Sequence, residues 1–110
     1  GKQGLAEAAR QCTAKAHYLA GRLFQETGAR PLASRPFFLE FPLVLPSAAA
    51  PVLERMEAEG FFAGLPLARL APELAPAGTD AQRVILVAVT EKRTREELDR
   101  YVETMKRILK

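Results

Sequence analysis

The apolar run "VILVAV" at residues 84–89 constrains the fold more than any other feature of this chain. A strand formed by these residues would be hydrophobic on both faces, because successive side chains point to opposite sides of a sheet. Such a strand belongs in the middle of a sheet rather than at its edge. The run comes late in the chain, so the sequence predicts that earlier strands leave a place for it between them.

The segment "PFFLEFPLVLP" at 36–46 predicts a second strand. Its aromatic and aliphatic side chains alternate with a period of two, which is typical of a strand with one buried face. Pro42 has no amide proton, and this favours a position at the edge of the sheet. A shorter extended piece is expected within 65–70. The following residues, 71–82, carry proline, glycine and aspartate and predict a solvated hairpin loop.

Two helices are predicted around these strands in the second half of the chain. One should begin at Ser47 as its N-cap and end at Gly60. The other should begin with a capping box, in which Thr94 and Glu97 bind each other's backbone amides. One stripe of the last helix is expected to face the core: Leu98, Tyr101, Val102, Met105, Ile108 and Leu109.

The first helix is predicted over about residues 3–27, with Gly28 as its stop. Its apolar residues fall into two stripes. The expected core stripe contains Leu5, Ala9, Cys12, Ala16, Leu19 and Leu23. The second stripe contains Ala6, Thr13, Ala20, Gly21 and Phe24. The helix propensity of alanine would explain part of the second stripe. The alternative is that the helix packs between two bodies, one of which is another part of a larger protein.

The order of elements is helix, strand, helix, strand, strand, helix, which predicts an α+β fold. If the strand at 84–89 lies between the other two, the result is a small three-stranded sheet of the split β-α-β type. The helices are expected to cover one face of that sheet. We expect a long connecting helix over residues 1–30 and a small α+β domain over residues 31–110. The chain begins with Gly1 and is helical almost at once, which suggests a fragment of a larger subunit.

No set of residues in this sequence predicts a catalytic, cofactor-binding or metal site. His17 is the only histidine and Cys12 the only cysteine, which excludes the usual multi-residue zinc sites. The two lie about 140° apart around a helix, too far for a thiolate–imidazole pair. Lys92 follows a strand, as a Schiff-base lysine can, but no phosphate-binding loop accompanies it. A solvated lysine is the better interpretation.

Composition excludes several other functions. The net charge is +3 with acids and bases interleaved, which predicts neither a nucleic-acid nor a membrane partner. The stretch "EKRTR" at 91–95 could contact phosphates, but it lacks interleaved aromatic residues. No apolar run approaches the roughly 18 residues of a membrane span. With one cysteine and no visible signal peptide, we expect a cytoplasmic protein.

Three stretches resemble a known family. They are "AKAHYLAGRL" at 14–23, "FFLEFPL" at 37–43 and "ILVAVTEKRTREELDRYV" at 85–102. Together they are similar to the C-terminal part of the glycine cleavage system P-protein, and more narrowly to its subunit 1, the alpha subunit of glycine dehydrogenase (decarboxylating). The stretch that begins "VTEKRT" is the most specific of the three. The resemblance spans nearly the whole chain but only about the last quarter of such a subunit.

This resemblance implies the small domain of a fold type I pyridoxal-phosphate enzyme. The parent enzyme of that family decarboxylates glycine on pyridoxal phosphate and passes the aminomethyl group to the lipoyl arm of H-protein. In two-subunit forms the cofactor lysine belongs to the other subunit. The implied partners are therefore the large domain of the same subunit, the second P-protein subunit and H-protein. No catalytic residue is carried over to this segment, whose implied role is positional.

Four residues are candidate contacts with the large domain or a second subunit: His17, Phe24, Lys92 and Arg93. The competing interpretation is a stand-alone α+β interaction or regulatory module, because many functions use a split β-α-β fold. The reading frame before Gly1 would separate the two. A large upstream α/β region favours the enzyme subunit, and an immediate start codon favours the module.

Overall fold

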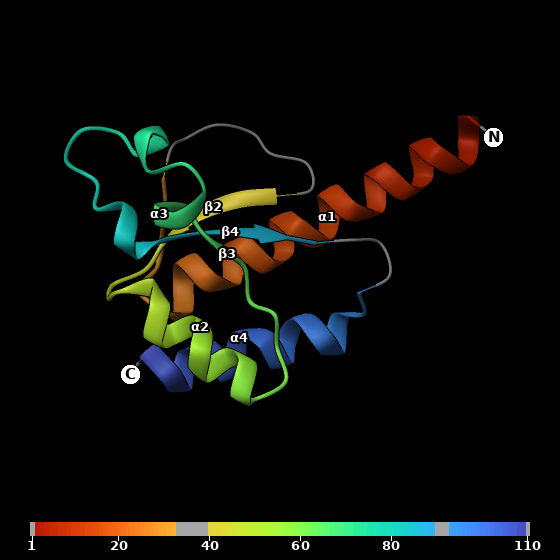
Figure 1. Ribbon diagram of the computed structural model, residues 1–110. Coiled ribbons are helices and arrows are strands. Elements are labelled where there is room, and N and C mark those ends of the chain that lie inside the picture. The colour runs from red at the N-terminus through yellow and green to blue at the C-terminus, as the bar shows by residue number, and fades with distance from the viewer. Residues whose placement is uncertain (1, 33–39, 90–92, 110) are drawn as a thin grey trace.

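The computed structural model describes residues 2–32, 40–89 and 93–109, and side chains from residue 14 onward. Figure 1 shows a small sheet with three longer helices gathered along one side of it. The helices are α1 (Lys2–Glu26), α2 (Ala49–Ala58), α3 (Leu67–Leu70) and α4 (Arg95–Leu109). The strands are β1 (Arg30–Pro31), β2 (Glu40–Val44), β3 (Leu65–Pro66) and β4 (Val84–Ala88). Two short 3₁₀ helices, η1 (Pro72–Leu74) and η2 (Ala81–Arg83), lie between α3 and β4.

The sheet is antiparallel throughout and has the order β1-β2-β4-β3. The apolar strand β4 therefore lies between β2 and β3, as its two hydrophobic faces predict. The sheet has four strands rather than the expected three. The additional strand, β1, pairs Arg30 with Val44 and Pro31 with Leu43. It was missed because two residues, one of them proline, show no alternation that a sequence pattern could reveal.

The segment at 65–70 also differs from the expectation of one extended piece. Only Leu65 and Pro66 form a strand, and the chain then turns directly into α3. Leu67 of α3 is buried against Val44 and Val84, on the face of the sheet away from the main core. The sequence analysis predicted that all helices cover one face of the sheet, and this is wrong for α3. The helices α1, α2 and α4 cover one face, and short α3 covers part of the other (Figure 1).

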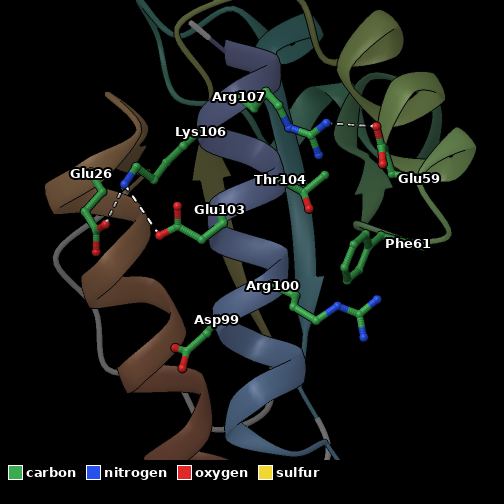
Figure 2. A pocket seen from close by; sticks show the side chains of 9 residues that line it. All are labelled: Glu26, Glu59, Phe61, Asp99, Arg100, Glu103, Thr104, Lys106 and Arg107. Atoms are coloured by element: carbon green, nitrogen blue, oxygen red, sulfur yellow. Dashed lines mark hydrogen bonds and ion pairs between the residues drawn. The ribbon is translucent and has the colours of Figure 1, made fainter.

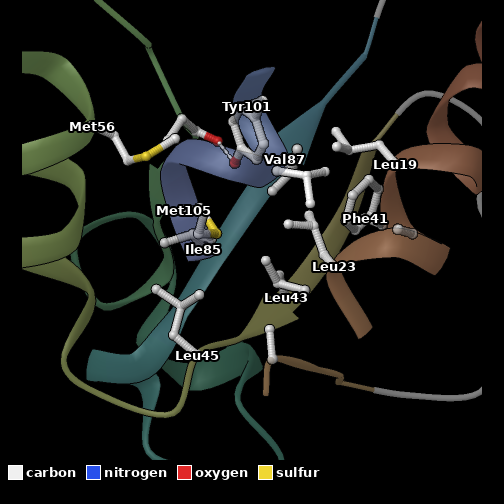
Figure 3. Packing of buried hydrophobic residues seen from close by; sticks show 14 of the residues in the cluster. Leu19, Leu23, Phe41, Leu43, Leu45, Met56, Ile85, Val87, Tyr101 and Met105 are labelled. Carbon is white, nitrogen blue, oxygen red and sulfur yellow. Dashed lines mark hydrogen bonds between the residues drawn. The ribbon is translucent and has the colours of Figure 1, made fainter. Parts of the chain in front are cut away.

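The main core lies between β2 and β4 and the three longer helices (Figure 3). Alternate strand residues, Phe41, Leu43, Ile85 and Val87, point into it and are almost fully buried. From the helices, the core receives Leu19, Leu23, Met56, Leu98, Val102 and Met105, among others. Tyr101 is also buried, and its hydroxyl donates a hydrogen bond of 2.7 Å to the backbone oxygen of Ala63. This bond fixes the chain between α2 and β3 to α4.

Pro42 lies in a strand that is second in the sheet order, although an edge was expected. The amide of Leu45 points toward the β4 side, where it donates to the Arg83 oxygen at 2.7 Å. Because backbone amides alternate along a strand, the nitrogen of Pro42 faces the opposite side. On that side β1 pairs only with Leu43 and Val44. Pro42 is thus beyond the pairing of β1, which explains how a proline fits here.

The predicted helix ends are mostly confirmed. Gly28 and Gly60 have φ values of 80° and 92°, the left-handed conformation that stops a helix. The start of α2 is an exception, because the helix begins at Ala49 after Ala48, and no side chain caps it. Ser47 is therefore not the N-cap. At α4 the capping box is formed: the Glu97 amide donates to Thr94 Oγ1 at 3.1 Å, and the Thr94 amide donates to Glu97 Oε1 at 3.0 Å.

Replacing Thr94 by alanine should lower the free energy of unfolding by about 1 kcal/mol, because an amide in the first turn of α4 loses its acceptor. Thr94→Ser is the matched control, since serine keeps the hydroxyl and should unfold close to wild type. Urea denaturation of the three chains would measure the difference. Equal midpoints for all three would show that the capping box does not stabilise the helix.

Candidate functional site

The helices α1 and α4 are joined by an ion cluster formed by Arg22, Glu26, Asp99, Glu103 and Lys106. The Arg22 guanidinium contacts Glu26 at 2.6 Å, and it also donates to Asp99 at 2.9 Å and to Glu103 at 3.0 Å. The Lys106 ammonium lies 3.2 Å from Glu26 and 3.5 Å from Glu103. Two basic groups thus hold three carboxylates drawn from two helices that lie far apart in the sequence.

Tyr18 and Arg95 extend this cluster toward the N-terminal end of α4. The Tyr18 hydroxyl donates to Asp99 Oδ1, and the Arg95 guanidinium lies over the Tyr18 ring, 4.4 Å from its centre. The hydrogen bond from Tyr18, together with Arg22, lowers the pKa of Asp99. The pKa of Glu26 is lowered to about 2, because Arg22 and Lys106 donate hydrogen bonds to its carboxylate. Glu26 and Asp99 are therefore charged at neutral pH.

A hollow lies beside the ion cluster, along α4 and between α1 and α2. Figure 2 shows nine side chains that line it: Glu26, Glu59, Phe61, Asp99, Arg100, Glu103, Thr104, Lys106 and Arg107. The charged groups are largely paired with one another. On the α2 side the Arg107 guanidinium lies 3.2 Å from Glu59, and the Arg100 guanidinium lies 5.6 Å from the centre of the Phe61 ring. Four of the nine side chains are carboxylates and three are basic, so the hollow lacks the excess of positive charge that favours a phosphate group.

Lys106, the one lysine that lines this hollow, does not suit a Schiff base with pyridoxal phosphate. A lysine that forms a Schiff base must lose its proton readily, and desolvation or a neighbouring cation usually lowers its pKa. The pKa of Lys106 is instead raised, because Glu26 accepts a hydrogen bond from it and Glu103 lies close. In the parts of the chain that the structure describes, no group of three or more metal-binding side chains is found either. We therefore derive no catalytic step for this hollow.

An apolar row crosses the second face of the sheet, away from α1, α2 and α4. Leu65, Leu86 and Pro42 are direct cross-strand neighbours, and Ala88 follows two residues after Leu86 on the same face. Phe62 lies beside this row at the β3 edge of the sheet, since it lines one hollow with Leu65 and side chains of α2, and another with Ala88 and side chains of α4. Phe62 and Leu65 are 82% and 42% exposed, and Ala88 is also exposed. We call these five residues the bare sheet face.

The four predicted contact residues lie in different settings. His17 is exposed on α1. Arg93 is exposed and forms an ion pair of 3.1 Å with Glu97. Phe24 is partly buried and packs against the main core. Lys92 lies outside the described residues. The structure thus brings no two of His17, Phe24 and Arg93 into one described site.

The second stripe of α1 was expected to face another part of a larger protein. For Ala20 this expectation is wrong. Ala20 is only 2% exposed and belongs to the core of this domain. Phe24 also contributes to that core, so only its remaining exposed part is open to a partner. The reason is that α1 packs against both the sheet and the neighbouring α4, so two of its faces are buried within the same domain.

The ion cluster predicts a specific loss of stability in acid. The pKa of Glu26 is lower in the folded protein than its ordinary value of 4.5, so its contribution is complete above that value. The contribution should be lost as the pH falls toward about 2. Urea unfolding measured at about pH 7, 4 and 2.5 should show this decline. In Arg22→Gln the decline should be shallower, because the pKa of Glu26 is then closer to normal. Parallel declines in both chains would contradict the assignment.

The chain resembles a segment of longer proteins over almost all its length. It is 46% identical over 105 residues to a probable glycine dehydrogenase (decarboxylating) subunit 1 of Chlorobium limicola, which covers 96% of this chain. It is 43% identical over 109 residues to the protein of that name in Moorella thermoacetica, which covers 99% of it. The chain spans only 21% and 23% of the length of these two relatives. No family model matches the chain.

Solved structures agree with this similarity. A crystal structure of glycine decarboxylase (P-protein) of the glycine cleavage system, in inhibitor-bound form, matches 99% of the chain with a TM-score of 0.83 and 31% identity. The chain covers 23% of that protein. A NifS-like protein matches with a TM-score of 0.80 at 17% identity, which shows a shared fold. By sequence and by fold, the chain is similar to a segment of glycine dehydrogenase (decarboxylating) subunit 1 proteins.

Proposed function

We propose that this chain is the C-terminal domain of a glycine dehydrogenase (decarboxylating) subunit and that its role is structural. The similarity to subunit 1 proteins over 96–99% of the chain carries the proposal. Residues 1–30 form the connecting helix in this proposal, and residues 31–110 form the small domain. The ion cluster between α1 and α4 supports it, because it would hold a connecting helix firmly to the domain that follows.

In this proposal, the complete enzyme decarboxylates glycine and transfers the aminomethyl group to lipoyl H-protein in the cytoplasm. Pyridoxal phosphate supplies the carbanion stabilisation when it is bound, and the second subunit supplies the cofactor lysine. This chain contributes position: its exposed His17 and Arg93, the exposed part of Phe24, and Lys92 contact the large domain or the second subunit. The paired charges of the hollow and the raised pKa of Lys106 support a role away from the cofactor.

The test is reconstitution of the complete enzyme. The full-length subunit that contains this chain would be combined with the second subunit and lipoyl H-protein, and exchange of labelled bicarbonate into glycine would be followed. We expect exchange from the complete set and a strong loss when the subunit lacks residues 1–110. An inactive complete set would refute the enzyme assignment. The stand-alone module would instead be supported by a start codon directly before Gly1.

The structural role has its own control. The 110-residue chain alone should show no saturable absorbance change with pyridoxal phosphate, whereas the reconstituted pair of subunits should show one. Saturable labelling of one lysine in the chain after borohydride reduction would contradict the structural role. It would leave the enzyme assignment intact, because that rests on the exchange assay.

A further inference from the structure

The hollow that Phe62 shares with side chains of α2 lies at the β3 edge of the sheet, and we call it the edge hollow. Its volume of about 660 Å³ lies within the range of about 300–1,000 Å³ that is usual for small-ligand sites. α2 packs on one face of the sheet and α3 on the other, and both helices line the hollow (Figure 1). The lining includes Leu53, Glu54, Glu57, Phe62, Gly64 and Arg69.

The two helices bring charges of opposite sign to the edge hollow. Glu54 and Glu57 lie on α2, and Arg69 lies on α3. All three residues are exposed, and none of them forms an ion pair with another side chain that the structure describes. In the hollow beside the ion cluster, by contrast, Glu59 pairs with Arg107. The charges of the edge hollow are therefore available to a ligand.

The rest of the lining is mostly apolar and includes Leu53, Phe61 and Phe62. Phe62 is 82% exposed, so most of its ring is open to contact. An apolar group that covered this ring would stabilise a complex through the hydrophobic effect. Apolar walls with a few charged groups are typical of a site that binds an amphipathic small molecule.

The backbone of Gly64 adds a donor and an acceptor to the edge hollow. Leu65 pairs with Leu86, and Pro66, which has no amide proton, pairs with Ile85. The Leu65 amide and carbonyl therefore point toward β4. Because these groups alternate along a strand, those of Gly64 point away from β4, toward the hollow that Gly64 lines. Neither group has a hydrogen-bond partner among the described residues, and together they match a peptide group.

We propose that the edge hollow binds a short peptide that has apolar side chains, a free ammonium group and a free carboxylate. The ammonium group pairs with Glu54 and Glu57, and the carboxylate pairs with the guanidinium of Arg69. A peptide group pairs with Gly64, and an apolar side chain covers Phe62. A longer strand is disfavoured, because β3 has only two residues. This binding involves no step of the proposed reaction and is independent of the enzyme assignment.

Isothermal titration calorimetry of the full-length subunit with leucyl-alanyl-leucine at low ionic strength tests the proposal. Two derivatives separate the ends of this peptide, because acetylation removes the ammonium charge and amidation removes the carboxylate. One variant is Arg69→Gln, and a second carries both Glu54→Gln and Glu57→Gln. Arg30→Gln is the control, since Arg30 is exposed on β1 at the opposite border of the sheet.

We expect saturable binding of the free peptide with a Kd of about 1 mM or below. Amidation should weaken binding to wild type and to Arg30→Gln by about two- to fivefold, the effect of one exposed charge pair. It should have little effect on binding to Arg69→Gln, which lacks the partner of the carboxylate. Acetylation should likewise weaken binding to wild type but not to the chain with both Glu54→Gln and Glu57→Gln.

Three results would overturn the proposal. The first is the absence of saturable binding to the full-length subunit. The second is binding to the 110-residue chain but not to the full-length subunit, because the rest of the subunit would then fill the hollow. The third is an equal loss on amidation in wild type and in Arg69→Gln, because the peptide would then bind elsewhere. Calorimetry does not depend on catalysis, so none of these results bears on the exchange assay.

Discussion

Replacing Phe41 by alanine should lower the free energy of unfolding by about 3–5 kcal/mol, the range for a large buried aromatic side chain. Phe41 is 1% exposed and lies opposite Val87 in the β2–β4 pair. Figure 3 shows it between the two strands and α1, where it lies near Leu19 and Leu23. Alanine would leave a cavity lined by both layers of the core, and neither layer could close it without moving a strand or a helix.

Phe62→Ala is the matched control, because it removes the same atoms from a side chain that is 82% exposed. Its effect on unfolding should be within about 0.5 kcal/mol of zero. Urea denaturation of the 110-residue chain would measure both variants. Similar losses for the two phenylalanines would mean that the burial of Phe41 described here is incorrect.

Replacing Gly64 by alanine should lower the free energy of unfolding by about 1–3 kcal/mol, the usual range for overpacking. A Cβ atom at Gly64 would lie 2.7 Å from the carbonyl oxygen of Leu86 and 3.3 Å from its carbonyl carbon. Both are backbone atoms of the central strand, so they cannot move aside as a flexible side chain could. The chain before β3 would have to withdraw from β4, which would weaken the pairing of Leu65 with Leu86.

Gly21→Ala is the matched control, because alanine at this second glycine should raise the free energy of unfolding rather than lower it. Gly21 lies inside α1, and an added Cβ there would meet no atom within 4 Å. Alanine should therefore stabilise the chain by up to about 1 kcal/mol through its helix propensity. Thermal unfolding followed by circular dichroism would place Gly64→Ala below wild type and Gly21→Ala at or above it. The reverse order would show that the approach of Gly64 to β4 is not close.

The elements with strong local signals were predictable from the sequence. The start of α4 was predicted because a capping box needs only two side chains three residues apart. The central place of β4 was predicted because its hydrophobicity on both faces excludes an exposed edge. In contrast, β1 exists only through its pairing with β2, and α3 interrupts a segment that is too short for any periodicity.

The ion cluster was missed for a related reason. Its partners lie 77 or more residues apart in the sequence: Arg22 is on α1, and Asp99 and Glu103 are on α4. The sequence contains the local spacing of Arg22 and Glu26, an i, i+4 pair that is usual on any exposed helix face. It contains no information that this face meets the acidic face of α4. The packing of two helices on one sheet determines that contact.

The bare sheet face was not predicted either, because Leu65 and Leu86 are ordinary apolar residues in strand-like segments. What distinguishes them is that they pair across the sheet, while the described residues that cover this face pack around Val44 and Val84. A similar limit explains the error at Ala20. Periodicity identified a second apolar stripe on α1 but could not show that the same domain supplies its partner.

Both lateral boundaries of the sheet are formed by strands of only two residues, and each contains a proline: Pro31 in β1 and Pro66 in β3. Short, proline-containing borders offer few free backbone groups to a strand from another molecule. These borders therefore disfavour amyloid-like stacking and strand exchange between copies. This holds even while the apolar side chains on the sheet face are exposed to solvent. A partner that covered the face of the sheet would contact side chains and leave the strand register unchanged.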